Sequence, residues 1–122
     1  FINIEDLNLE FNCIEKIEPY SFSSLDFLVE LILSNNNLSV LDNGTLDGLF
    51  QLRFLNLSKN HLEHIYSDLF ADLFSLLSLD LNYNKLKFLD NGSFRNLNQL
   101  KYLNLDNNEN FTILEESLKG LS

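Results

Sequence analysis

Five asparagines recur along this chain at a constant interval of 24 residues, and each one closes a set of regularly spaced leucines or isoleucines. The second copy, for example, reads Leu28, Leu31, Leu33 and then Asn36. The asparagines are Asn12, Asn36, Asn60, Asn84 and Asn108. A repeat this short cannot bury an apolar face by itself, so the fixed period predicts a solenoid in which each coil stacks on the next.

Each repeat predicts one short strand. In Leu-x-x-Leu-x-Leu the last three positions alternate, which is the period-two pattern of a strand with its leucines on one side. Successive strands must then pair in parallel to bury that side. The asparagine follows where the chain turns inward, and its carboxamide can satisfy backbone groups that no strand reaches. We therefore predict that the five asparagines form a structural ladder. A second apolar series is expected to fill the convex side, where the chain is extended or forms short 3₁₀ turns: Phe22, Leu46, Phe70, Phe94 and Leu118.

This pattern, over residues 4–122, resembles the typical 24-residue leucine-rich repeat of animal extracellular proteins. The resemblance implies an α/β-type solenoid, a curved horseshoe with a parallel concave β-sheet and an irregular or 3₁₀ convex side. It makes residues 1–122 one domain with the repeats 4–27, 28–51, 52–75, 76–99 and 100–122, of which the last loses phase at Asn110. Such relatives usually carry cysteine-rich caps, and Cys13 is the single cysteine, so we expect a fragment that lacks its caps. Cys13 itself is expected to be a small, partly buried filler, with a reactive or interchain thiol as the alternative.

Acceptor triplets for N-linked glycans favour an extracellular or cell-surface location. Five occur, against about two expected by chance from the composition, at Asn37, Asn43, Asn56, Asn91 and Asn110. Asn43 and Asn91 are the best candidates because both stand in the turn-like sequence Leu-Asp-Asn-Gly. Asn56 is open to the alternative that the repeat pattern itself generates its triplet.

The strand residues that point away from the leucines line the concave sheet, where solenoids usually bind their partners. Large apolar or aromatic groups on that open face are typical of interface anchors, and Phe54 and Tyr102 are the strongest candidates. The predicted partner-binding residues are Asp6, Glu30, Ile32, Phe54, Asp80, Tyr83 and Tyr102. Phe11 and Tyr83 could equally cover the edge of a coil, and Ser34 and Ser58 fall among the positions assigned to the concave face.

Charge narrows the class of partner. The formal net charge is -10, and residues 1–51 contain nine acidic residues against Lys16 alone. An acidic face repels phosphate backbones, so we expect a protein ligand or co-receptor, with a homodimer as a further option, and no nucleic acid. Alternatively, the charge serves only solubility. No apolar run is long enough to span a bilayer, so membrane attachment is expected only through a segment outside this chain.

Catalytic and metal motifs are weak. His61 and His64 stand three residues apart, but no third histidine follows and the pair lies in the turn after Asn60. The acidic stretch around Asn108 lacks the glycine and final glutamate of a calcium loop. We therefore expect no enzyme, no metal and no cofactor.

Two classes of function follow from these patterns. The first is a non-catalytic recognition module, the ligand-binding ectodomain segment of a secreted or cell-surface receptor; the sequence looks most like Toll-like receptors and related immune proteins. The second is a matrix or adhesion protein of the leucine-rich proteoglycan kind. A cytosolic regulator is a third interpretation, which the number of glycan acceptor triplets disfavours.

Overall fold

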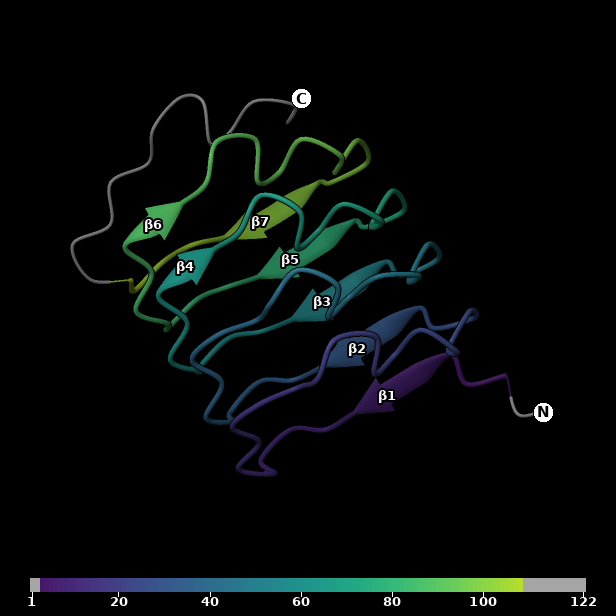
Figure 1. Ribbon diagram of the computed structural model, residues 1–122, viewed down its shortest axis with the longest axis horizontal. Helices are drawn as coiled ribbons and strands as arrows, with labels where there is room; N and C mark the ends of the chain where they lie inside the picture. The colour runs from purple at the N-terminus through teal and green to yellow at the C-terminus, as the bar shows by residue number, and fades with distance from the viewer. Residues whose placement is uncertain (1–2, 109–122) are drawn as a thin grey trace.

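The computed structural model describes residues 3–108, which form a solenoid of strands and turns (Figure 1). A five-stranded parallel sheet has the order β1-β2-β3-β5-β7, and a second sheet pairs β4 with β6. The strands are β1 (Asp6–Asn8), β2 (Glu30–Ile32), β3 (Phe54–Asn56), β4 (His64–Ile65), β5 (Ser78–Asp80), β6 (Phe88–Leu89) and β7 (Tyr102–Asn104). The predicted parallel solenoid is confirmed.

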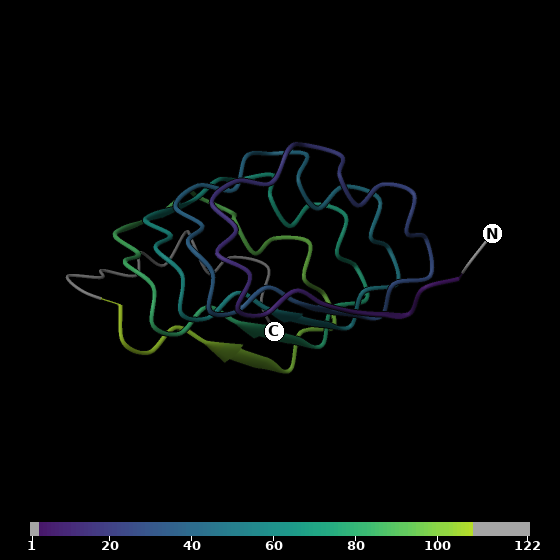
Figure 2. The ribbon, with the colours of Figure 1, turned by 90° about the horizontal axis from the view of Figure 1, so that it is seen from below.

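The register of the large sheet follows the sequence period. Leu31 of β2 pairs with Leu55 of β3, and Leu55 pairs with Leu79 of β5, so residues 24 apart in sequence lie side by side. Figure 2 shows the strands along one side of the molecule and the irregular connections along the other. Any residue type placed at one repeat position therefore forms a row across the coils.

The core lies between the sheet and these connections. Leu31, Leu55 and Leu79 are buried, and so are Phe22, Leu46, Phe70 and Phe94 of the convex series. The fifth member of that series, Leu118, lies outside the described residues. The rings of Phe70 and Phe94 stack with 6.1 Å between their centroids. Stacking of equivalent residues explains why one layer can be repeated with little change.

Asparagine side chains join consecutive coils. Asn60 Oδ1 accepts a hydrogen bond from the Leu38 amide at 3.0 Å, and Asn60 Nδ2 donates to the carbonyl of Leu33, one coil earlier, at 3.0 Å. Asn36, Asn84 and Asn108 make the equivalent bonds. Asn12, in the first coil, is exposed and donates only to carbonyls of its own coil. The ladder thus connects backbone groups that the short strands leave unpaired.

The convex side takes the irregular form. Among residues 3–108 there is no helix, either α or 3₁₀, and the connections are isolated turns such as the Leu73 amide bonding to the Phe70 carbonyl at 3.1 Å. Of the two forms predicted for this side, irregular or 3₁₀, the described residues adopt the irregular one. The pairing of β4 with β6 was not predicted, because two-residue strands leave no periodic signal in the sequence.

Two expectations about exposure were wrong. Ser34 and Ser58 are only 2% and 7% exposed, although period-two alternation placed them on the concave face. The residues that follow them, Asn35 and Lys59, have φ of 55°, and this left-handed bend ends the alternation one residue early. Cys13 is exposed rather than partly buried. The equivalent residues of later coils, such as His61 and Lys85, are exposed too, so this position after the asparagine faces solvent in every coil that can be compared.

Candidate protein-binding surface

Two rows of side chains cover the solvent side of the large sheet. Register defines the first row as Asp6, Glu30, Phe54, Ser78 and Tyr102, and the second as Asn8, Ile32, Asn56, Asp80 and Asn104. Within each row, neighbouring side chains stand on adjacent strands, about 4.8 Å apart. The strand register alone therefore brings large, small and charged side chains together on this face of the sheet.

The middle of these rows forms a shallow hollow of about 180 Å³, which we call the concave hollow. Its side chains come from β2, β3, β5 and β7: Glu30, Ile32, Phe54, Asn56, Ser78, Asp80 and Tyr102. Ser78 lies between Phe54 and Tyr102 in the register, so a small side chain separates two large rings. The hollow therefore results from the order of large and small residues along one row.

The rings beside the concave hollow are open to solvent. Phe54 is 42% exposed and Tyr102 is 51% exposed. The Tyr102 hydroxyl accepts a hydrogen bond from Asn104 Nδ2 at 3.1 Å, which fixes one end of the ring. Exposed aromatic side chains held in place lose little conformational freedom when a partner covers them, which suits them to binding.

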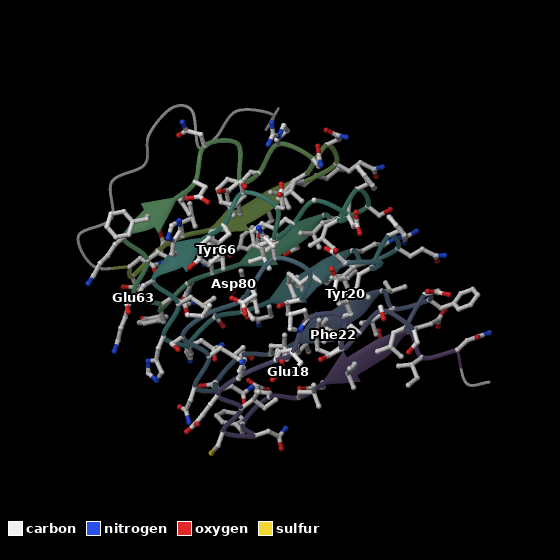
Figure 3. The ribbon with its side chains drawn as sticks, in the orientation of Figure 1. Glu18, Tyr20, Phe22, Glu63, Tyr66 and Asp80 are labelled. Carbon is white, nitrogen blue, oxygen red and sulfur yellow. The ribbon has the colours of Figure 1, made fainter. Side chains whose placement is uncertain are left out.

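The charged side chains of the concave hollow are all acidic. Glu30 and Asp80 are the charged side chains of the lining, and no basic residue lines it. Asp80, labelled in Figure 3, extends from β5 and accepts a hydrogen bond from the Asn82 amide through Oδ1 at 3.0 Å. Asp6 pairs with Glu30 on the adjacent strand and adds a third carboxylate at the side of the hollow.

The structure brings five of the seven predicted partner-binding residues together in the concave hollow: Glu30, Ile32, Phe54, Asp80 and Tyr102. Asp6 lies one strand beyond it, and Tyr83 lies in the bend after β5. Asn56 and Ser78 line the hollow but were not among the predicted partner-binding residues. The register could have indicated Ser78, since it stands 24 residues from both Phe54 and Tyr102.

A separate row follows the ends of the strands, where each coil bends before its ladder asparagine. These residues all have φ between 55° and 60°: Phe11, Asn35, Lys59, Tyr83 and Asn107. Phe11 is 72% exposed, so it does not cover the coil edge. Tyr83 does make a packing contact, because Lys59 Nζ lies 5.8 Å from the centroid of its ring. None of these residues lines the concave hollow.

The two histidines play different parts. His64 Nε2 lies 2.5 Å from Asp90 Oδ1 in the next coil, and its ring stacks on Tyr66 with 4.4 Å between centroids. Figure 3 shows Glu63 and Tyr66 beside β4, and Lys87 pairs with Glu63 at 3.2 Å. His61 is exposed. No group of three or more metal-ligating side chains occurs among the described residues. His64 therefore acts as a link between coils on the flank of the solenoid.

One carboxyl group on the convex side is perturbed. The pKa of Asp47 is raised above its usual value, first by burial and then by repulsion from Asp72 and Asp68. Asp72 Oδ2 accepts a hydrogen bond from the Gly48 amide at 2.9 Å, which holds it near Asp47. This cluster carries an electrostatic cost in the folded state and lies away from the concave hollow.

The glycan acceptor asparagines differ in exposure. Asn37, Asn43 and Asn91 are exposed. Asn56 is half-buried in β3, where its Oδ1 accepts hydrogen bonds from the Ser58 amide and hydroxyl. Asn110 lies outside the described residues. In the described part of the chain, no helix is long and apolar enough to cross a bilayer.

Comparison with known proteins places the fold in a family. The family model described as "Leucine rich repeat" matches residues 2–62 and 55–109, and a second model with the same description matches residues 99–121. The chain therefore belongs to the leucine-rich repeat family.

The chain is similar to Toll-like receptors, among other proteins. The chain is 48% identical over 52 residues to Toll-like receptor 9 of Canis lupus familiaris, which is 43% of this chain and 5% of that protein. The crystal structure of a TLR13-ssRNA13 complex superposes with a TM-score of 0.90 and 30% identity over 96% of this chain and 16% of that one. The leucine-rich repeat domain of APL1B gives a TM-score of 0.89 at 22% identity, over 98% of this chain and 35% of that one, and shows the fold alone. The chain thus spans a small part of each of these proteins.

Proposed function

We propose that this chain is a non-catalytic recognition module, a segment of a receptor ectodomain, and that it contacts a protein partner through the concave hollow. The observation that carries the proposal is the exposure of Phe54 and Tyr102 on either side of Ser78, over the rigid parallel sheet. Aromatic groups at the centre of a hollow are the usual anchors of protein interfaces. The family supports recognition over catalysis, since repeat solenoids offer extended surfaces for binding.

An extracellular or cell-surface location and an innate-immune role belong to the same proposal. They are supported by the similarity to Toll-like receptor 9 and TLR13, and by the exposure of Asn37, Asn43 and Asn91. Exposed acceptor asparagines are compatible with glycans on a folded solenoid. A matrix or adhesion role would use the same sheet, and it would differ in having a structural protein as the partner.

The test begins with the secreted and surface proteins of the source organism. A partner captured by the wild-type chain is purified, and its affinity is measured for Phe54→Ala, Tyr102→Ala and the control Phe74→Ala. Phe74 is also exposed, but it stacks on Phe50 outside the concave hollow. Loss of a central anchor costs at least about 2 kcal/mol, or roughly 30-fold in affinity, whereas the control should bind like wild type. Equal affinity for all four proteins would refute the site.

A second candidate ligand is single-stranded nucleic acid. The specific observation is that the similar TLR13 structure is a complex with ssRNA. In this chain the carboxylates of Glu30 and Asp80 disfavour phosphate at the concave hollow. RNA would have to bind instead near the bends that follow the strands, where Lys59 lies over Tyr83 and Lys85 is exposed.

Fluorescence anisotropy with a labelled single-stranded RNA at physiological salt separates these candidates. We expect no binding at micromolar concentrations. Binding that weakens in Lys59→Gln and Lys85→Gln, and that is unchanged in Phe54→Ala, would establish a nucleic-acid function and place it outside the concave hollow.

A further inference from the structure

We propose that the concave hollow receives an arginine side chain of the partner protein. This inference rests on the proposed function, since it names the group that the same hollow would bind. Four properties of the lining support it: its charge, its hydrogen-bond acceptors, its aromatic rings and its size.

The charge of the concave hollow favours a cation. Glu30 and Asp80 belong to no ion pair among residues 3–108, where the ion pairs are Lys16 with Glu18, His64 with Asp90, and Lys87 with Glu63. The basic residues that directly precede the strands, Arg53 and Lys101, are not part of the lining. Two carboxylates that share one small hollow without a counter-charge attract a cationic group.

The hydrogen-bonding groups at this end of β5 are short of donors. Asp80 Oδ1 accepts one bond from the Asn82 amide. Glu30 forms no ion pair among residues 3–108. A ligand with several N–H donors would complement such a surface better than a second acceptor would.

The rings favour a flat cation. Phe54 and Tyr102 stand two strands apart, about 10 Å by ordinary strand spacing, with only Ser78 between them. A group that enters the hollow beside Ser78 therefore lies close to aromatic side chains. Guanidinium is planar, stacks on aromatic faces and is always charged, whereas an ammonium is a strongly hydrated point charge. The contact of Lys59 with Tyr83 shows that this solenoid already places a cation over a ring.

The size limits the guest to one side chain. The hollow of about 180 Å³ is too small for an element of secondary structure. Ile32 gives it one aliphatic wall, against which the methylene stem of an arginine can pack. The expected partner segment therefore presents an arginine with apolar neighbours.

Two synthetic peptides test this inference: Ac-Gly-Leu-Arg-Leu-Gly-NH2 and the same peptide with citrulline, which has the shape of arginine without its charge. Each is titrated into the isotope-labelled protein and followed by chemical-shift changes. We expect the arginine peptide to bind about tenfold more tightly than the citrulline peptide, with changes centred on the strands of the concave hollow. Equal binding of the two peptides, or no binding by either, would overturn the inference.

Variants locate the effect. Glu30→Gln and Asp80→Asn should each weaken the arginine peptide about three- to tenfold and leave the citrulline peptide unchanged. Asp6→Asn is the matched control, because it removes the same charge one strand outside the lining. An equal loss in Asp6→Asn would show that only the general field of the protein acts, which would also overturn the inference.

The outcome separates this inference from the proposed function. If neither peptide binds but Phe54→Ala still weakens the protein partner, the recognition surface stands and arginine is wrong. If the arginine peptide binds at the hollow but Phe54→Ala leaves the partner's affinity unchanged, the hollow binds arginine and the proposed function is wrong.

Discussion

Asn60→Ala tests the ladder most sharply. Asn60 forms four hydrogen bonds, accepting from the Leu38 amide and donating to the carbonyls of Leu33, Leu57 and Ser58. The three carbonyls keep other donors in the variant: the side chains of Asn36 and Asn84, and the amide of Asn35. The Leu38 amide has no second acceptor among the described bonds, and Leu38 is completely buried.

The expected loss of stability therefore comes from one buried amide without an acceptor and from three carbonyls that each lose one hydrogen bond. A buried donor left without a partner costs about 1–3 kcal/mol, so we expect a loss of that size in the free energy of unfolding. Urea denaturation followed by far-ultraviolet circular dichroism measures it, because the chain contains no Trp.

Asn12→Ala is the matched control for this experiment. Asn12 is exposed, and among residues 3–108 its carboxamide bonds only to carbonyls of its own coil, so its loss should cost less than about 0.5 kcal/mol. If the two variants lose equal stability, or if Asn60→Ala loses less than its control, the asparagines do not act by satisfying buried backbone groups.

Other predictions concern charge, modification and the thiol. Because the pKa of Asp47 is raised in the folded protein, its ionised form costs stability that is recovered as pH falls through the folded pKa toward 3.8. Asp47→Asn should accordingly raise Tm at neutral pH, and the gain should vanish below about pH 3.8 in thermal scans; an unchanged Tm at pH 7 would contradict this. Mass spectrometry of the natural protein should find glycans on Asn43 and Asn91, and bare asparagine at both would count against the extracellular location. Cys13→Ser should change Tm by less than about 1 °C, because the thiol is exposed; a larger shift in calorimetry would mean that the thiol packs.

The sequence predicted the parts of the fold that depend on periodicity. The leucines, the convex phenylalanines and the ladder asparagines repeat at 24 residues, and each coil repeats the same backbone. The predicted exposure of Ser34 and Ser58 was wrong because strand alternation was extended past a left-handed bend. A bend with φ of 55° to 60° requires no particular residue type, since Phe11, Asn35 and Lys59 all adopt it. The prediction that Cys13 is partly buried was wrong because it relied on the residue type. The equivalent position is exposed in later coils as well.

The candidate site was predictable to the extent that it lies on regular strands. Phe54, Tyr102 and Asp80 were found by alternation alone, and the register then places them in one hollow. Tyr83 falls outside the hollow because the bend after β5 turns it away from the two rows. Ser78 was overlooked because a search for anchors selects large residues, whereas a hollow depends equally on the small residue between them.

Asn56 shows how the two proposals limit one another. It lines the concave hollow, and it is also a glycan acceptor. A glycan on its Nδ2 would leave Oδ1 free to keep the bonds from Ser58, so folding alone does not forbid the modification. The sugar would nevertheless fill a hollow of about 180 Å³, beside Phe54, and would exclude an arginine. A recognition surface here thus requires bare Asn56, even if the exposed asparagines Asn43 and Asn91 were to carry glycans.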